Sequence, residues 1–260
     1  MNLEAKGDWG AQPPRKRGLF PRSLEILYED RHLLAVAKPG GMLVQGDRTR
    51  DETLLDQVRA YLREKYAKPG GIYLGLVHRL DRVTSGVVLL ARTSKAARRL
   101  CRDFREGIVR KAYLAVVEGR FPLEAGVLRH YLHWDEKEGR TLVREKPAED
   151  FREAVTGFET LSRGLNHTVL LLFPETGRKH QLRAQLSYMG YPVVGDRRYG
   201  SRRRVHKGRA ILLHALALAL RHPLGGGLLF LWAPLPPYFP RISLSRSRLE
   251  TFLSHRFPGS

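Results

Sequence analysis

A single carboxylate, Asp81, lies among basic side chains in residues 78–86, which also hold His78, Arg79 and Arg82. Because nearby positive charge favours the charged form of an acid, we expect Asp81 to be a carboxylate at neutral pH, available as a nucleophile or a base. The same residues are rich in turn formers and precede an apolar run at 87–90, which is typical of a turn before a strand. The residue pattern alone leaves both interpretations open.

Short apolar segments separated by polar turns flank this stretch. They predict strands at residues 33–37, 112–117, 127–132, 155–158 and 168–173, and a last strand at 211–220 that closes the sheet. Helical spacing predicts three helices, one after a capping box at Thr53, one from Ser94, and one over residues 178–189 that ends at Gly190. Strands in hairpin-like succession with a few helices indicate an α+β fold with a mixed, largely antiparallel sheet.

The helix from Ser94 predicts the environment of Cys101, the only cysteine of the chain. Helical spacing groups Cys101 with Ala97, Leu100 and Phe104 on one apolar face. We therefore expect Cys101 to be a core residue and not a nucleophile.

Residues 78–86 resemble the H-R-L-D-x-x-T-S-G signature of the RluA family of pseudouridine synthases. Further blocks of that family follow in order, at residues 111–113, 176–183, 190–196 and 213–215, and the resemblance runs from about Leu24 to about Phe239. It implies a single catalytic domain at residues 23–258, its mixed, largely antiparallel sheet flanked by helices. Residues 1–22, rich in glycine, proline and charge, are predicted to be a disordered basic arm.

Two departures from the family's usual sequence lie in the third block. Lys179 stands where the family most often has Thr, and Ala184 and Gln185 stand where it has Val and His, although a branch of the family resembles this chain at both places. These positions leave the subfamily open, and with it the RNA target.

The resemblance implies isomerisation of uridine to pseudouridine in RNA. That reaction breaks the glycosidic bond of a uridine, rotates the base and rejoins it to the sugar through a ring carbon. Since no redox step is involved, we expect no cofactor. The active site must supply a carboxylate, a cation that holds the carboxylate, a surface that packs against the released uracil, and a base that accepts the final proton.

The family motifs imply roles for residues of this chain. Asp81 corresponds to the catalytic aspartate, Arg183 to its basic partner, and Tyr113 to the tyrosine that stacks on the uracil and takes the final proton. Arg79 corresponds to an arginine that enters the RNA stack where the target base leaves it. The remaining motif positions assigned to substrate binding are His78, Thr84 and Arg178, of which His78 is interpreted as a structural residue that hydrogen-bonds across its loop.

The charge of the chain points to a polyanionic partner. It has 46 Lys and Arg against 26 Asp and Glu, a net charge of +20, and a pI near 10.6. Such an excess favours nucleic acid. Residues 196–209 carry seven cations and one acid, and we expect a phosphate-binding rim there that includes Arg202, Arg203 and Arg204; a solvated loop is the alternative.

Competing functional classes fit the sequence less well. A glycosidase would need a second carboxylate as proton donor, and a metal enzyme a fuller set of ligands than His130, His133 and Asp135 supply. We expect a cytoplasmic monomer with no metal and no membrane partner, acting on structured RNA through its catalytic domain and basic rim. Large-subunit ribosomal RNA is the favoured substrate, and transfer RNA is the alternative substrate. A less favoured alternative function is that of a non-catalytic RNA-binding ribosome-assembly factor.

Overall fold

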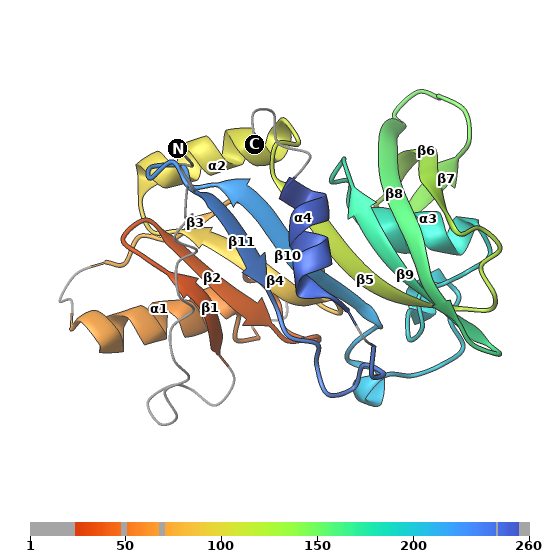
Figure 1. The fold of residues 1–260 in the computed structure, drawn as a ribbon, viewed down its shortest axis with the longest axis horizontal. Helices are drawn as coiled ribbons and strands as arrows, with labels where there is room; N and C mark the ends of the chain where they lie inside the picture. The colour runs from red at the N-terminus through yellow and green to blue at the C-terminus, as the bar shows by residue number, and fades with distance from the viewer. Residues whose placement is uncertain (1–23, 48–50, 68–70, 243, 255–260) are drawn as a thin grey trace, which may run out of the picture.

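One mixed sheet forms the frame of the molecule (Figure 1). The computed structural model describes residues 24–47, 51–67, 71–242 and 244–254, so the predicted arm at 1–22 lies outside the described residues. The strand order is β1-β2-β4-β10-β5-β9-β8-β6-β7, with β11 paired to β10 and β3 to β4. The strands are β1 (Glu25–Glu29), β2 (Leu33–Lys38), β3 (Gly75–Leu76), β4 (Ser85–Ala91), β5 (Arg110–Glu118), β6 (Ala125–Asp135), β7 (Arg140–Arg144), β8 (Arg152–Arg163), β9 (His167–Pro174), β10 (Leu213–Arg221) and β11 (Leu228–Trp232).

The sheet is largely antiparallel, as predicted, but the place of the last predicted strand was wrong. Strand β10 does not close the sheet: it lies between β4, its parallel partner, and β5, its antiparallel partner. Eight of its nine residues are buried, which agrees with a central position. An apolar run of this kind shows that a strand is covered on both faces; it does not show which strands flank it.

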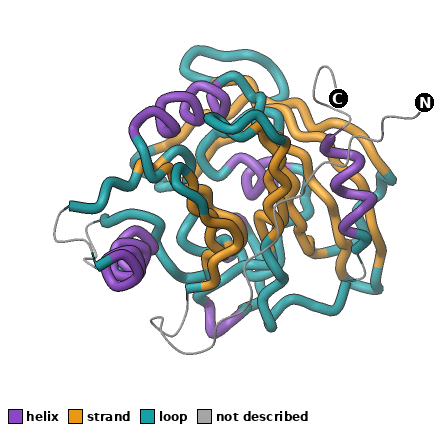
Figure 2. The backbone as a smooth tube through the Cα atoms, turned by 60° about the vertical axis from the view of Figure 1, so that its left-hand side comes forward, coloured by secondary structure: helices purple, strands orange, loops and turns teal. Residues whose placement is uncertain are grey.

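Helices cover both faces of the sheet, as Figure 2 shows from a second direction. Alternate residues of β2 explain the arrangement at one end: Leu34 and Val36 pack with α1, whereas Leu33 and Ala35 pack with α2. At the other end of the sheet, alternate residues of β5 and β9 pack with α3 on one face and with α4 on the other. The α-helices of the described residues are α1 (Leu54–Tyr66), α2 (Ser94–Arg105), α3 (Gln181–Tyr188) and α4 (Arg246–Ser254).

Local signals account for where these helices begin. Thr53 caps α1 through the predicted capping box, in which its side chain accepts from the Asp56 amide and the Asp56 carboxylate accepts from the Thr53 amide. Helix α3 starts later than predicted, at Gln181, because His180 adopts a left-handed conformation with φ of 54°. That bend directs the residues before α3 along the cavity described below.

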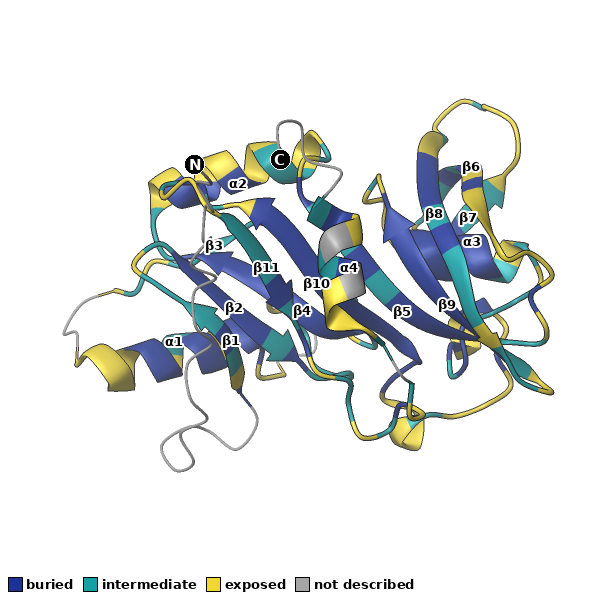
Figure 3. Ribbon diagram, viewed as in Figure 1, coloured by how far each residue is buried: buried dark blue, intermediate teal, exposed yellow. Residues whose placement is uncertain are grey.

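One expectation about the core was wrong. Cys101 is exposed, although Ala97 and Leu100 on the same helix are buried as predicted. With 3.6 residues per turn, Cys101 lies at the edge of the apolar face, where it borders a cavity instead of the sheet. Figure 3 shows the buried strands and the exposed outer faces of the helices. Within the described residues, no helix is long and apolar enough to cross a membrane.

Candidate active site

The loop between β3 and β4 carries Asp81 and is held by backbone hydrogen bonds. The Gly41 amide donates to the Arg82 carbonyl at 2.7 Å, and the Ile211 amide donates to the Val83 carbonyl at 3.1 Å. After the loop, Gly86 has a φ of +123°, and a Cβ there would lie 2.2 Å from the Ala215 carbonyl oxygen of β10. Only glycine permits this approach, which brings the loop against the central strand.

Lys38 holds the same loop in place through hydrogen bonds. Its side chain is 1% exposed, and its Nζ donates to the carbonyls of Pro39, Met42 and Arg82 at 2.9, 2.8 and 3.2 Å. Burial lowers the pKa of Lys38 to about 7, against the opposing effect of the Asp81 charge. Lys38 is a residue of the site that sequence reasoning did not single out.

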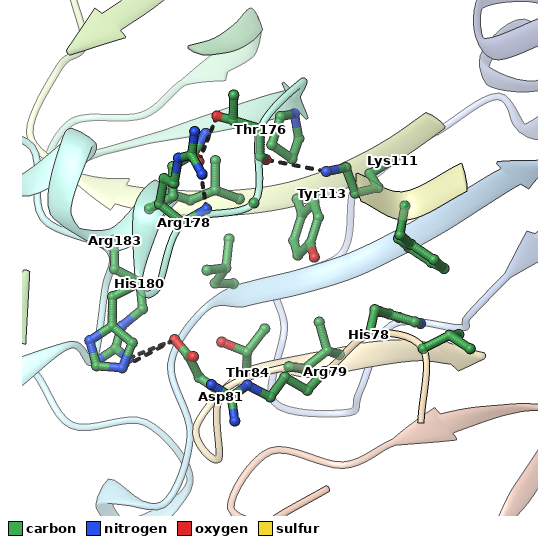
Figure 4. Close-up of a pocket in the computed structure, with 18 of the residues that line it drawn as sticks. His78, Arg79, Asp81, Thr84, Lys111, Tyr113, Thr176, Arg178, His180 and Arg183 are labelled. Atoms are coloured by element: carbon green, nitrogen blue, oxygen red, sulfur yellow. Dashed lines mark hydrogen bonds and ion pairs between the residues drawn. The ribbon is translucent and has the colours of Figure 1, made fainter. Parts of the chain in front are cut away.

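A guanidinium joins two carboxylates at the centre of the site, and Figure 4 shows it beside the first of them, Asp81. Arg183 donates from Nη1 to Asp81 Oδ2 at 2.8 Å, and from Nε and Nη2 to the two Asp196 oxygens at 2.6 and 2.9 Å. The side chains of Arg183 and Asp196 are 5% and 2% exposed, while that of Asp81 is 28% exposed. Burial works against the Arg183 charge, but the hydrogen bonds and charges of Asp196 and Asp81 outweigh it and raise the pKa of Arg183.

The structure thus brings the two residues predicted to pair, Asp81 and Arg183, into contact. Asp196 was missed as a partner, although it is the single acid in the basic run at 196–209. A lone acid among cations is a usable signal, because such a carboxylate stays ionised and is available to hold a buried cation of the site. The Tyr199 ring, 5.0 Å from the Arg183 guanidinium carbon, covers the pair.

His180 is a second neighbour of Asp81 that sequence reasoning did not single out. Its Nε2 lies 3.7 Å from Asp81 Oδ2, and its Nδ1 is 2.9 Å from the Tyr199 hydroxyl. Burial lowers the pKa of His180 to about 4, against the opposing charge of Asp81. The imidazole is therefore neutral at neutral pH and contacts Asp81 without adding a charge.

A cavity of about 600 Å³ opens beside Asp81 and holds most of the predicted residues. Tyr113 projects into it from β5, and burial followed by the Asp81 charge raises the pKa of the phenol. The hydroxyl therefore keeps its proton at neutral pH, which favours the expected stacking role of Tyr113 over its expected role as acceptor of the final proton. The Thr84 hydroxyl is buried and has no hydrogen-bond partner among the described residues. The predicted residues that line this cavity are His78, Arg79, Asp81, Thr84, Tyr113, Arg178 and Arg183.

His78 forms its side-chain hydrogen bond with β4, where a bond across its own loop was expected. Its Nε2 accepts from the Leu89 amide of β4 at 2.8 Å, and its ring stacks on Phe104 of α2 at 4.6 Å. Burial, with a smaller effect from the Lys111 charge, lowers the pKa of His78 to about 3. An acceptor nitrogen on a neutral ring suits a residue that ties the loop to β4, not an acid.

A second cavity, of about 650 Å³, also opens beside Asp81 and Arg183. Both cavities share Arg79, Arg178 and His180, and the second adds Lys179, Arg197 and Arg198. By contrast, Arg202, Arg203 and Arg204 are exposed and line neither cavity. In the described part of the chain, no three His, Cys, Asp or Glu side chains gather as ligands for a metal ion.

Comparisons with known proteins match most of the chain. The model of the family described as RNA pseudouridylate synthase matches residues 32–188. The ribosomal large subunit pseudouridine synthase C of Buchnera aphidicola is 34% identical over 225 residues, covering 82% of this chain and 68% of that protein. The tRNA pseudouridine synthase C of Pectobacterium carotovorum is 35% identical over 242 residues, covering 82% of this chain and 60% of that protein.

A solved structure shares the fold as well. Human RNA pseudouridylate synthase domain containing 1 superposes with a TM-score of 0.69 at 29% identity, covering 89% of this chain and 95% of that one. The likeness extends across the sheet that positions Asp81, Tyr113 and Arg183, beyond the part matched by the family model. The chain therefore belongs to the RNA pseudouridylate synthase family of isomerases.

Proposed function

We propose that this pseudouridine synthase modifies uridines in large-subunit ribosomal RNA, with Asp81 as the catalytic carboxylate. The observation that carries the assignment of Asp81 is its bond to the buried Arg183, at the junction of two cavities lined by cations. The name of the Buchnera relative supports the ribosomal substrate. The Pectobacterium relative, named for transfer RNA, favours transfer RNA as the second candidate.

Arg183 has two tasks in this proposal. Its Nη1 fixes one Asp81 oxygen, so the other oxygen, on a side chain that is 28% exposed, is left facing the space where the nucleotide binds. Its remaining donors engage Asp196, so the guanidinium cannot swing away when Asp81 reacts. A preorganised pair of this kind saves reorganisation during the glycosidic bond cleavage.

Tyr113 and Thr84 would contact the uracil base. A phenol that keeps its proton presents an uncharged ring, and such a ring packs against uracil without repelling it. The unpartnered Thr84 hydroxyl supplies a hydrogen bond to a polar edge of the nucleotide, because an unsatisfied buried group gains most from a ligand that pairs with it. Arg79, exposed at the mouth of both cavities, fits a side chain that fills the gap left in the RNA stack.

The test of the catalytic assignment is Asp81→Asn, which keeps the size of the side chain and removes its charge. We expect pseudouridine formation to be abolished while RNA affinity stays within a few-fold; retention of about a tenth of wild-type turnover or more would remove Asp81 from the central role. Asp51→Asn is a matched control, since Asp51 also pairs with an arginine, Arg82, at 2.6 Å, but lines neither cavity.

The test of the substrate is a map of pseudouridines in a strain that lacks this protein. Loss of a site from large-subunit ribosomal RNA, restored by the wild-type enzyme and not by Asp81→Asn, supports the proposal. Loss from transfer RNA alone would replace it with the second candidate.

A further inference from the structure

Helix α2 presents a strongly basic surface whose charge nothing in the fold requires. It carries five cations and one acid over residues 94–105. Three of the cations, Lys95, Arg98 and Arg105, are exposed and form no ion pair or hydrogen bond with any described residue. We call these three residues the α2 cationic face.

The three side chains lie on one side of the helix and continue into the first cavity. Because an α-helix has 3.6 residues per turn, positions 95, 98 and 105 fall within about 80° of one another around its axis. Cys101 and Phe104 lie next to them, and these two residues line the first cavity together with Arg105. The cationic face therefore reaches the mouth of the space that holds Asp81 and Tyr113.

The stability of α2 does not account for this charge. Cations near the amino end of a helix oppose its dipole, and the first turn of α2 contains Lys95 and no acid. Solubility would be served equally well by mixed charges. Arg105, in the last turn, interacts favourably with the dipole, but Lys95 and Arg98 do not gain from it. A basic surface that borders the active site is better explained by a ligand, and the charge specifies a polyanion.

The two cavities show where this surface lies relative to the basic segment at 197–209. Cys101 and Arg105 line only the first cavity, Arg197 and Arg198 line only the second, and both cavities share Asp81. Asp81 therefore lies between two cationic surfaces. In Figure 1, α2 is at the top of the molecule and the light blue segment around residue 205 is at the bottom.

We propose that the α2 cationic face binds the phosphates of the RNA on one side of the target uridine, while the strand on the other side passes over residues 197–209. The proposal rests on the proposed function only in taking RNA as the partner. Lys95 and Arg105 are ten positions apart, about 15 Å of helix, a length over which a nucleic-acid strand presents several phosphates. Three phosphate contacts fit in that length.

The first test measures the salt dependence of RNA binding by a variant with Lys95→Gln, Arg98→Gln and Arg105→Gln. Each lost phosphate contact lowers the logarithmic slope by about 0.7 on single strands to about 0.9 on duplex, so the slope should fall by roughly 2 to 3. A matched variant with Arg120→Gln, Lys137→Gln and Lys146→Gln loses the same charge at exposed positions that line neither cavity, and its slope should change much less. Equal slopes for the two variants would overturn the proposal.

The second test uses Cys101, the only cysteine of the chain, as a site for a thiol-reactive photocrosslinker. With a large-subunit ribosomal RNA transcript and the Asp81→Asn background, we expect crosslinks a few nucleotides from the target uridine and on one side of it only. Crosslinks at the target alone, or on both sides equally, would contradict a strand path over α2.

The proposed substrate can fail separately from this inference. If a transfer RNA transcript gives the one-sided crosslinks and the slope change, the α2 surface stands and the ribosomal substrate falls. If the wild-type enzyme modifies ribosomal RNA while the two triple variants bind it alike, the substrate stands and the α2 surface falls.

Discussion

The pair of buried charges at Arg183 and Asp196 allows the structural and catalytic roles of the arginine to be separated. Arg183→Met removes the cation and leaves Asp196, 2% exposed, without its two hydrogen bonds at 2.6 and 2.9 Å. Breaking a buried pair from one side costs about 3 to 5 kcal/mol. At about 2 to 4 °C per kcal/mol for a domain of this size, Tm should fall by roughly 6 to 20 °C.

A second variant removes both charges. Arg183→Met with Asp196→Leu leaves no uncompensated charge, and replacing a buried ion pair by apolar side chains is often close to neutral. We expect most of the lost Tm to return and the activity to remain absent, since Asp81 still lacks its partner. Asp81→Asn is the control, because loss of a partly exposed charge should abolish activity with little effect on Tm.

Calorimetry and single-turnover pseudouridine formation on the same four proteins provide the measurements. A wild-type Tm for Arg183→Met would refute the argument from buried charge. Recovery of activity in the double variant would refute the pairing of Arg183 with Asp81 as a requirement for catalysis. The first result concerns the fold and the second concerns the chemistry, so each part of the reasoning can fail alone.

Three further predictions concern base access, the basic rim and pH. Arg79→Ala should lose activity on a structured RNA far more than on a short unstructured RNA, because unstacking costs a few kcal/mol; equal losses in single-turnover rate would argue against base access. Neutralising the three arginines at 202–204 should lower the salt slope of RNA binding by about 0.7 to 0.9 per contact, and an unchanged slope would indicate a solvated loop. Burial holds the pKa values of His78, His180 and His214 at about 3, 4 and 4. Below pH 6.5 the unfolded chain therefore binds more protons than the folded protein. The free energy of unfolding should be highest above pH 6.5 and lower by about 2 kcal/mol for each of these histidines at pH 5. Urea unfolding at pH 7 and pH 5 measures this loss, and equal free energies of unfolding would contradict it.

The sequence by itself determined the local features of this protein. Hydrophobic spacing located most strands and the starts of α1 and α2, because a helix or strand pattern depends on residues only a few positions apart. The motif at 78–86 identified the family and pointed to Asp81, because it is a contiguous string. The excess of basic residues indicated a polyanionic partner, since net charge does not depend on how the chain folds.

The family resemblance implied that Arg183 pairs with Asp81, but tertiary structure alone decided the rest of the surroundings, Asp196 and His180. Arg183 is 102 residues away in sequence, and only the packing of α3 against the sheet brings its guanidinium to both Asp81 and Asp196. The central place of β10 likewise depends on pairing with β4 and β5, which are distant in sequence. Cys101 was misplaced because periodicity assigns a residue to a helix face but not to the cavity that the neighbouring elements leave beside it.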